Sequence, residues 1–462
     1  MLKKKVMMIA DMLIAASLFA GCGAAGNTVG TSAEASGTES ISKNEGTTTE
    51  ETEGSLTKED TENENDMSAE EFLSSDAYTQ FISDKEEAVA ESSKNQDTLN
   101  AYLQDTVPEI LKDDGVSNVI YSPANVYIEL AMLARCTSGE TQQQLFSLLG
   151  ADSTEEISSI VDAILGANAA ENPLVTTTFG NSMWLQEELN YNEDTLQSLA
   201  DSYHAYSYVG DLSSEEANDA LHQWINDNTG NLLSDAADGL KMDQETVMSL
   251  VSTLYLKASW QSSFYAEDTT TETFHGAEDM EVSMMHQTLS TDVFQGNGFR
   301  ALALNLSYCG KMWIFLPDAD TELSALPANE DVYRILSGDE TMESTYAEVN
   351  LSLPKFDVQS DLDLIDALKA LGVEDMFTDA ADFTPLTADT GCAVSQLEHA
   401  ARVKTDEDGI EAAAFTAAMV GATSIMENET MDFNVDHPFL FAVQGEDGSV
   451  LFTGLVNSPE TE

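Results

Sequence analysis

The segment at residues 407–439 constrains the fold of this chain more than any other stretch of its sequence. After a charged turn it becomes a run of small residues, rich enough in alanine to favour a helix, although Gly421 disfavours one. Counted in steps of two over residues 410–422, one face is small or apolar at every position and carries no charge. Because alternate side chains of a strand share one face of a sheet, this segment could enter a sheet as an added strand. The alternative is an alanine-rich surface helix without a function.

The charge balance excludes several classes of partner. The 462 residues include 83 Asp and Glu against 18 Lys and Arg, a net charge of −65, while hydrophobic residues make up 42%, enough for a sizeable core. Such a surface repels nucleic acid and anionic membranes and argues against heparin-like cofactors, which need basic patches. We therefore expect no cofactor, and cationic proteins as the natural partners.

The sequence carries no recognisable catalytic or metal-binding motif. The GxSxG, HExxH, Walker and GxGxxG patterns are absent from it, and its six histidines show no metal-ligand spacing. We therefore expect neither an enzyme nor a metal site. The sequence also lacks a CxxC pair, so we expect Cys136, Cys309 and Cys392 to be buried as small hydrophobic residues.

The N-terminus predicts export from the cell. Residues 1–21 combine three lysines, an apolar stretch and a small-residue site, the pattern of a secretory signal peptide, and the apolar run is too short for a comfortable transmembrane anchor. The sequence around Cys22 resembles the lipidation box of bacterial lipoproteins. This implies a lipid anchor at the extracellular face of a bacterial cell membrane, or secretion. Residues 22–66 have the composition of a disordered tether, and residues 67–95 carry a weak helical pattern.

The segment at residues 407–439 resembles the reactive-centre loop of the serpins, a family of serine protease inhibitors. It begins E-D-G-I-E-A-A-A-F-T, close to the family's E-E-G-T-E-A-A-A-x-T, and it closes on Phe433 and Pro438-Phe439, as F-x-x-x-x-P-F does in serpins. Further family motifs occur in the expected order, among them S-P at residues 122–123, L-P-K-F at 353–356 and A-D-F at 381–383. The resemblance extends over residues 96–460.

This resemblance implies one α+β domain over residues 96–462 with the serpin fold. Such a domain has a large central, mostly antiparallel β-sheet, secondary sheets, about nine helices and an exposed reactive-centre loop. We expect it to be a monomer, with residues 67–95 as a possible extra helix in front of it.

The resemblance also implies roles for individual residues. The hinge of the loop comprises Glu407, Gly409, Ile410, Glu411, Ala412, Ala413 and Ala414. A hydrogen-bonding cluster that controls opening of the sheet comprises Ser122, Asn125, Ser252 and His399. Counting forward from Gly409 places the bond cleaved by a protease at Thr423–Ser424, whereas counting back from Pro438 points nearer Glu427. Cys22 is the expected lipidation site.

The family mechanism implies a suicide-type inhibitor of serine proteases, in which the cleaved loop enters the central sheet while the protease is still attached as an acyl-enzyme. Because no Lys or Arg lies between Gly409 and Pro438, we expect elastase-like or subtilisin-like targets. Ile410 and Phe415, where the family has smaller residues, favour the alternative of a non-inhibitory serpin-fold surface lipoprotein with a binding or adhesion role. A solute-binding lipoprotein would fit the tether but not residues 96–460.

Overall fold

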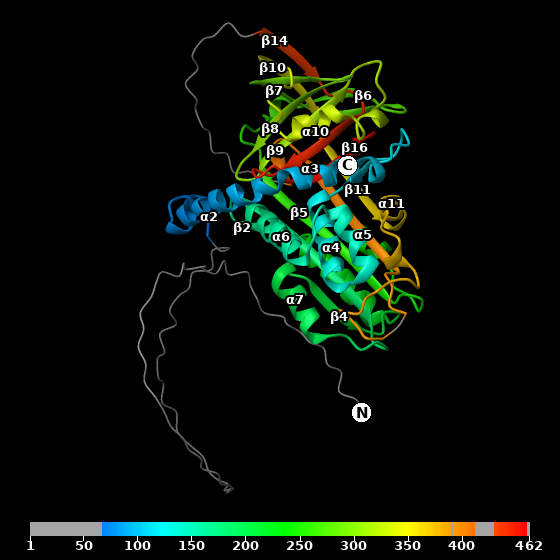
Figure 1. Ribbon diagram of the computed structural model, residues 1–462. Helices are drawn as coiled ribbons and strands as arrows, with labels where there is room; N and C mark the ends of the chain where they lie inside the picture. Colours follow the sequence, from blue (N-terminus) through cyan, green and yellow to red (C-terminus); the bar gives the residue numbers. More distant parts are fainter. Residues whose placement is uncertain (1–66, 390, 412–428, 460–462) are drawn as a thin grey trace, which may run out of the picture. The chain divides into compact units, whose positions relative to one another are not determined.

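The computed structural model describes residues 67–389, 391–411 and 429–459, which belong to one compact unit (Figure 1). Several predicted features fall on residues outside these ranges. They are the signal peptide at 1–21, the lipidation site Cys22, the tether at 22–66, the hinge residues Ala412, Ala413 and Ala414, and the bond between Thr423 and Ser424.

The central sheet has the strand order β11-β12-β13-β5-β3-β2, with β4 beside β3. Its strands are β2 (Ala170–Asn172), β3 (Val175–Gln186), β4 (Tyr206–Gly210), β5 (Met248–Ser259), β11 (Phe356–Asp363), β12 (Gln396–Thr405) and β13 (Gly409–Ile410). Most neighbours run antiparallel, but β12 pairs in parallel with β5, and β3 pairs in parallel with β4. The mostly antiparallel central sheet implied by the sequence is therefore present.

A second sheet has the order β1-β16-β15-β9-β8-β7-β10-β14, with β6 beside β7. Its strands are β1 (Val119–Tyr121), β6 (Thr270–His275), β7 (Asp279–Gly296), β8 (Phe299–Leu306), β9 (Gly310–Pro317), β10 (Ser344–Pro354), β14 (Glu429–Asn434), β15 (Phe439–Gln444) and β16 (Val450–Val456). Figure 1 shows β6, β7, β8, β10 and β14 gathered at the upper end of the domain. Strand β14, the first described element after residue 428, pairs in parallel with β10.

The described part of the chain has nine α-helices from Gln96 onward, α3 to α11, and two before it. They are α1 (Ala69–Leu73), α2 (Asp76–Ser92), α3 (Gln96–Ile110), α4 (Pro123–Cys136), α5 (Gly139–Leu149), α6 (Thr154–Asn168), α7 (Glu193–Tyr203), α8 (Glu215–Asn228), α9 (Ser234–Gly239), α10 (Glu330–Leu336) and α11 (Ile365–Ala370). The predicted α+β class, with a large sheet, a secondary sheet and about nine helices, is confirmed. Helices α1 and α2 occupy the stretch with the weak helical pattern.

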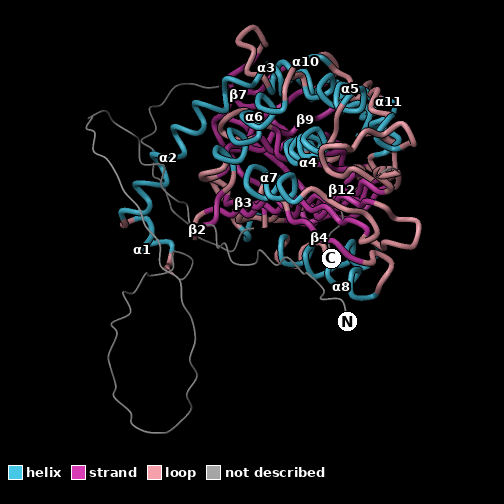
Figure 2. The backbone as a smooth tube through the Cα atoms, turned by 60° about the horizontal axis from the view of Figure 1, so that its bottom comes forward, coloured by secondary structure: helices cyan, strands magenta, loops and turns pink. Residues whose placement is uncertain are grey.

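Helix α4 lies in the core because its sequence is apolar on almost every side. All of its residues except Arg135 are buried, which is typical of a helix enclosed by a domain. It begins at the S-P motif, where the Ser122 side chain accepts a hydrogen bond from the backbone N–H of Asn125 and Pro123 takes the first helical position. It packs against β5 and β3, and Figure 2 shows it among α5, α6 and α7.

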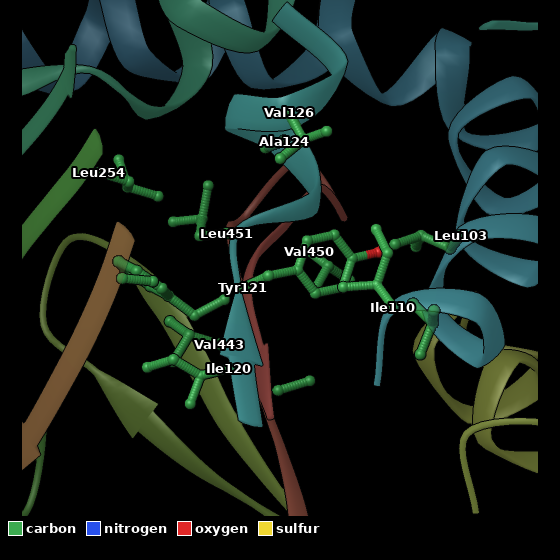
Figure 3. Close-up of a cluster of buried hydrophobic side chains, with 14 of the residues drawn as sticks. Leu103, Ile110, Ile120, Tyr121, Ala124, Val126, Leu254, Val443, Val450 and Leu451 are labelled. Atoms are coloured by element: carbon green, nitrogen blue, oxygen red, sulfur yellow. The ribbon is translucent and has the colours of Figure 1, made fainter. Parts of the chain in front are cut away.

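The two faces of the central sheet are covered by different hydrophobic clusters. Leu250 and Leu254 of β5 belong to the larger cluster, which includes α4, whereas Val251 packs with Leu221 of α8 in a smaller one. This alternation follows from the two-residue period of a strand. Figure 3 shows the part of the larger cluster that joins α3, α4 and the strands near them, with Leu103, Ile110, Ile120, Tyr121, Ala124, Val126, Leu254, Val443, Val450 and Leu451 labelled.

The helices that precede the domain are attached to it near both ends of α2. At the first end, Phe72 is 1% exposed and its ring packs against Tyr78 and Phe81. Both of those rings contact Tyr308, in the turn between β8 and β9. This aromatic contact fixes α1 and the start of α2 to the second sheet.

The other end of α2 is fixed by a buried carboxylate. Asp447, in the turn between β15 and β16, is 3% exposed. Its Oδ2 accepts hydrogen bonds from the hydroxyls of Ser92 and Ser449, both at 2.6 Å, and from the side-chain amide of Asn168 at 3.1 Å. One carboxylate thus joins the end of α2, the end of α6 and a turn of the second sheet.

We expect Asp447→Ala to lower the free energy of unfolding by about 3 kcal/mol, because buried hydrogen bonds to a charged group are lost and their donors are left unpaired. The neighbouring Glu446→Ala is the control. Glu446 is 41% exposed in its side chain and forms a long ion pair of 3.8 Å with Lys85, so we expect a loss of at most about 1 kcal/mol. Urea unfolding of both variants measures this, and equal losses would contradict the assigned role of Asp447.

Candidate functional site

The hinge begins as a short strand placed between two strands of the central sheet. Ile410 of β13 pairs with Thr405 of β12 on one side, and Gly409 and Ile410 pair with Ser259 and Ala258 of β5 on the other. The Ile410 side chain is 2% exposed. A Cβ atom at position 409 would lie 2.2 Å from the backbone oxygen of Ala258, so this close approach requires glycine.

Glu411, the last described hinge residue, lies among cations on the sheet. Its backbone N–H donates to the carbonyl of Lys404 at 3.0 Å, and its φ of 44° turns the chain out of the strand. Burial raises the pKa of its carboxyl, while Lys257, Arg402 and Lys404 act in the opposite direction. Three basic side chains therefore act on the carboxyl of the last described hinge residue.

The residues before β13 are held by a set of hydrogen bonds that we call the hinge clasp, centred on Glu407. The Glu407 carboxylate accepts from Lys355 Nζ at 2.5 Å and from Thr269 Oγ1 at 2.7 Å. Backbone N–H groups of Phe264 and Trp260 donate to the carbonyls of Glu407 and Asp408. Burial acts to raise the pKa of Glu407, but the bonds from Lys355 and Thr269 outweigh it and hold the pKa below its usual value.

Below the hinge, β5 and β12 pair with each other directly. We call this the seam, and it comprises the parallel register pairs from Gln396↔Ser249 to Ala400↔Thr253. Strand β13 separates the same two strands at the upper end of the sheet. A loop that continued along the line of β13 would therefore have to separate the seam.

His399 connects the seam to the helix beneath it. The ring is 0% exposed, and burial lowers its pKa to about 3, so the imidazole is neutral at physiological pH. Its Nε2 accepts a hydrogen bond from the backbone N–H of Ser122 at 2.9 Å, which places the ring proton on Nδ1. Nδ1 is 2.8 Å from Ser252 Oγ and donates to it across the seam.

The four residues predicted to form the sheet-opening cluster lie close together in the structure. Ser122, Ser252 and His399 form the hydrogen-bonded chain just described. Asn125 joins it through its backbone N–H, which donates to Ser122 Oγ at 3.2 Å. Its side-chain amide is buried and has no hydrogen-bond partner within the described ranges.

Sequence reasoning missed two polar residues at the same place, Glu129 and Asn181. Glu129 lies one turn after Asn125 on α4, and Asn181 of β3 is the register partner of Ser252. Both are almost completely buried. A signal for Glu129 was available, since it is the one charged residue in the apolar run at residues 126–133.

The described residues give no indication of a metal centre or a membrane span. Among them, no group of three or more His, Cys, Asp or Glu side chains is arranged to hold an ion, and none of their helices has the length and apolarity needed to cross a bilayer. Cys136, Cys309 and Cys392 are buried as free thiols, as the sequence predicts, and burial raises the pKa of Cys392 to about 11.

We expect Lys355→Met to loosen the hinge clasp and to lower the free energy of unfolding at pH 7 by about 2 kcal/mol, because the Glu407 carboxylate loses a charged hydrogen bond. Since the native pKa of Glu407 is below its ordinary value, this stabilisation is present at neutral pH and is lost as the pH falls through that pKa. The difference from the parent should therefore shrink towards pH 3. Urea unfolding at both pH values measures it, with the exposed Lys112→Met as control. A pH-independent difference would argue against the clasp.

Comparison with known proteins places this geometry in a family. The family model described as serpin (serine protease inhibitor) matches residues 98–459. The leukocyte elastase inhibitor of Sus scrofa is 29% identical over 357 residues, which are 74% of this chain and 93% of that protein.

Solved structures agree. Arabidopsis AtSerpin1 in its native stressed conformation is similar with a TM-score of 0.67 and 27% identity, covering 80% of this chain and 98% of that one. Human thyroxine-binding globulin complexed with thyroxine has a TM-score of 0.69 at 20% identity, covering 79% and 99% of the two chains. Since the family model covers most of the chain, the protein belongs to the serpin family.

Proposed function

We propose that this protein is a suicide-type inhibitor of serine proteases. The observation that carries the proposal is the position of β13, which already lies between β5 and β12 at the upper end of the seam. A protease serine attacks the loop and forms an acyl-enzyme. Cleavage then frees the loop to continue between β5 and β12, which moves the attached protease before the acyl-enzyme is hydrolysed.

The direction of the hinge side chains supports this function. Ile410 is buried on the same sheet face as Ala258, its neighbour in β5, and both belong to the core cluster that includes α4. With the two-residue period of a strand, residues 412, 414 and 416 would follow it onto that face. They are Ala, Ala and Thr, so their burial leaves no unpaired charge in the sheet.

The alternative function is that of a non-inhibitory serpin-fold surface protein with a binding or adhesion role. Its support comes from Ile410 and Phe415, which stand where the family has smaller residues. Human thyroxine-binding globulin, which has a similar fold, is known in complex with thyroxine. The two functions differ in one observable, a covalent complex with a protease that survives boiling in detergent.

The proposal extends to the partners and the location. The similarity to a leukocyte elastase inhibitor supports serine proteases as targets, and the charge of −65 favours cationic ones. We propose no enzymatic activity, a monomeric inhibitor, and attachment through a lipid on Cys22 at the outer surface of a bacterial cell, or secretion.

We expect Ala414→Arg to convert the inhibitor into a substrate. Position 414 is on the face that would be buried, so insertion would place an unpaired guanidinium under the sheet. Cleavage should continue while the covalent complex is lost, as seen by denaturing gel electrophoresis. The matched control is Ala413→Arg, on the outward face, which should retain most of the complex. An Ala414→Arg variant that traps protease at the parent rate would refute the assignment of the two faces.

We expect elastase-like and subtilisin-like proteases to be trapped faster than trypsin, with cleavage at Thr423–Ser424. No Lys or Arg lies between Gly409 and Pro438, so a protease with an acidic specificity pocket finds no cation to bind. Stopped-flow association rates with the three enzymes, and mass spectrometry of the released peptide, measure the two parts. Fastest trapping of trypsin, or cleavage outside residues 422–427, would contradict the prediction.

A further inference from the structure

A buried carboxyl group without a described partner lies beneath the seam. Glu129 is 1% exposed, and neither of its oxygens has a hydrogen-bond partner among the described residues. It projects from α4, which packs directly against β5. Asn125 lies one helical turn earlier. Its side-chain Nδ2 and Oδ1 are also buried and have no hydrogen-bond partner among the described residues. Residues four apart on a helix share one face, so the two side chains are neighbours.

The strands above contribute to the same polar cluster. Asn181 is 2% exposed, pairs with Ser252 across β3 and β5, and also has both amide atoms buried without a described partner. The Ser252 hydroxyl oxygen accepts a hydrogen bond from His399 Nδ1–H, so the hydroxyl hydrogen of Ser252 can be donated to another group. The Ser252 hydroxyl is close enough to lower the pKa of the Glu129 carboxyl, although the two groups do not meet the geometry of a hydrogen bond.

No described cation compensates a charge on Glu129. Burial raises its pKa to about 8, the Ser252 hydroxyl lowers it in part, and the negative charge of Glu398 on β12 raises it further. His399, also on β12, is neutral. Tyr102 of α3 is close enough to interact electrostatically with Glu129, and its own pKa is raised, chiefly by burial. The groups around Glu129 therefore favour its protonated form.

The protonated carboxyl also matches its neighbours chemically. It has one donor and free acceptor positions, and each amide of Asn125 and Asn181 offers both kinds of group. A carboxylate would only accept, and it would bring an uncompensated charge under the central sheet. Water that enters when β5 and β12 separate would solvate that charge.

We propose that Glu129 is a proton-linked latch on the seam: β5 and β12 stay paired while Glu129 holds its proton, and their separation is coupled to its release. The coupling would set how readily the sheet admits the loop, and to that extent it rests on the proposed inhibitory function. Opening of the seam can be measured without any protease, so the proposal about Glu129 and the proposed inhibitory function can be refuted independently of each other.

The direction and pH range of the coupling follow from the two states. With the seam closed the pKa of Glu129 is about 8, and with the seam open and the carboxyl in water it returns towards the ordinary 4.5. Below 4.5 the carboxyl is neutral in both states and pH has no effect. Between 4.5 and 8 only the open state releases its proton, so opening becomes more favourable as the pH rises. Above 8 the effect levels off.

Hydrogen–deuterium exchange of the full chain, followed by mass spectrometry of peptides covering residues 249–253 and 396–400, tests the latch. Exchange is compared between the parent and Glu129→Gln at each pH from 5.5 to 8.5, so that the intrinsic pH dependence of exchange cancels. We expect the ratio of parent to variant exchange to rise with pH, by up to about tenfold per unit below 8, and then to level off. A ratio that stays constant over this range would overturn the proposal.

Glu398→Gln is the control. Glu398 is a half-buried residue next to His399 in the sequence, and the pKa of the Glu398 carboxyl is also raised, to about 7. The Glu398→Gln variant should retain most of the pH dependence of seam opening. If the pH dependence is lost in Glu398→Gln but kept in Glu129→Gln, the titrating group is Glu398 and the assignment to Glu129 is wrong. Infrared difference spectra at pH 6.5 supply a second readout that does not depend on opening. The parent should show the carbonyl band of a protonated acid that Glu129→Gln lacks, and a carboxylate band in its place would refute the protonated state.

Discussion

The direct pairing between β5 and β12 is the interaction on which the rest of this structure depends. Two parts of the site are positioned by these strands: β13 lies between their upper ends, and α4 packs beneath β5. His399 spans the pairing and connects it to the first residues of α4. The sheet is therefore closed by a few backbone hydrogen bonds and by side-chain hydrogen bonds of His399 and Ser395, with the hinge strand held at its upper end.

Several of the few basic residues of this chain lie around the hinge. The whole sequence has only 18 Lys and Arg, yet Lys257, Lys355, Arg402 and Lys404 all lie around the hinge. Arg402 and Lys404 also pair with Asp357 of β11. In a chain with so large an excess of carboxylates, these cations offset part of the negative charge of Glu407 and Glu411 at the hinge.

Much of this arrangement was predictable from sequence because it depends on local chemistry. The S-P motif fixes the start of α4, and the E-D-G-I sequence places glycine where the backbones of β13 and β5 approach closely. Interactions between distant residues were not predictable in this way. The buried anchor of α2 joins Ser92 to Asp447, 355 residues apart, and no local pattern marks such a pair. The convergence of Glu129 and Asn181 likewise depends on how α4 lies under the sheet, which periodicity alone does not determine.

The strand directions at the seam have a consequence for the energy of the native fold. Strand β12 runs parallel to β5, whereas β13 runs antiparallel to both. Each loop residue that followed β13 downward would exchange one parallel contact for two antiparallel ones, and parallel pairing is slightly less stable per residue. The gain would be on the order of 1 kcal/mol for each additional backbone hydrogen bond. In this topology a lengthened β13 would fill a position between β5 and β12, and each added antiparallel hydrogen bond would offset part of the conformational entropy lost on ordering the inserted residue.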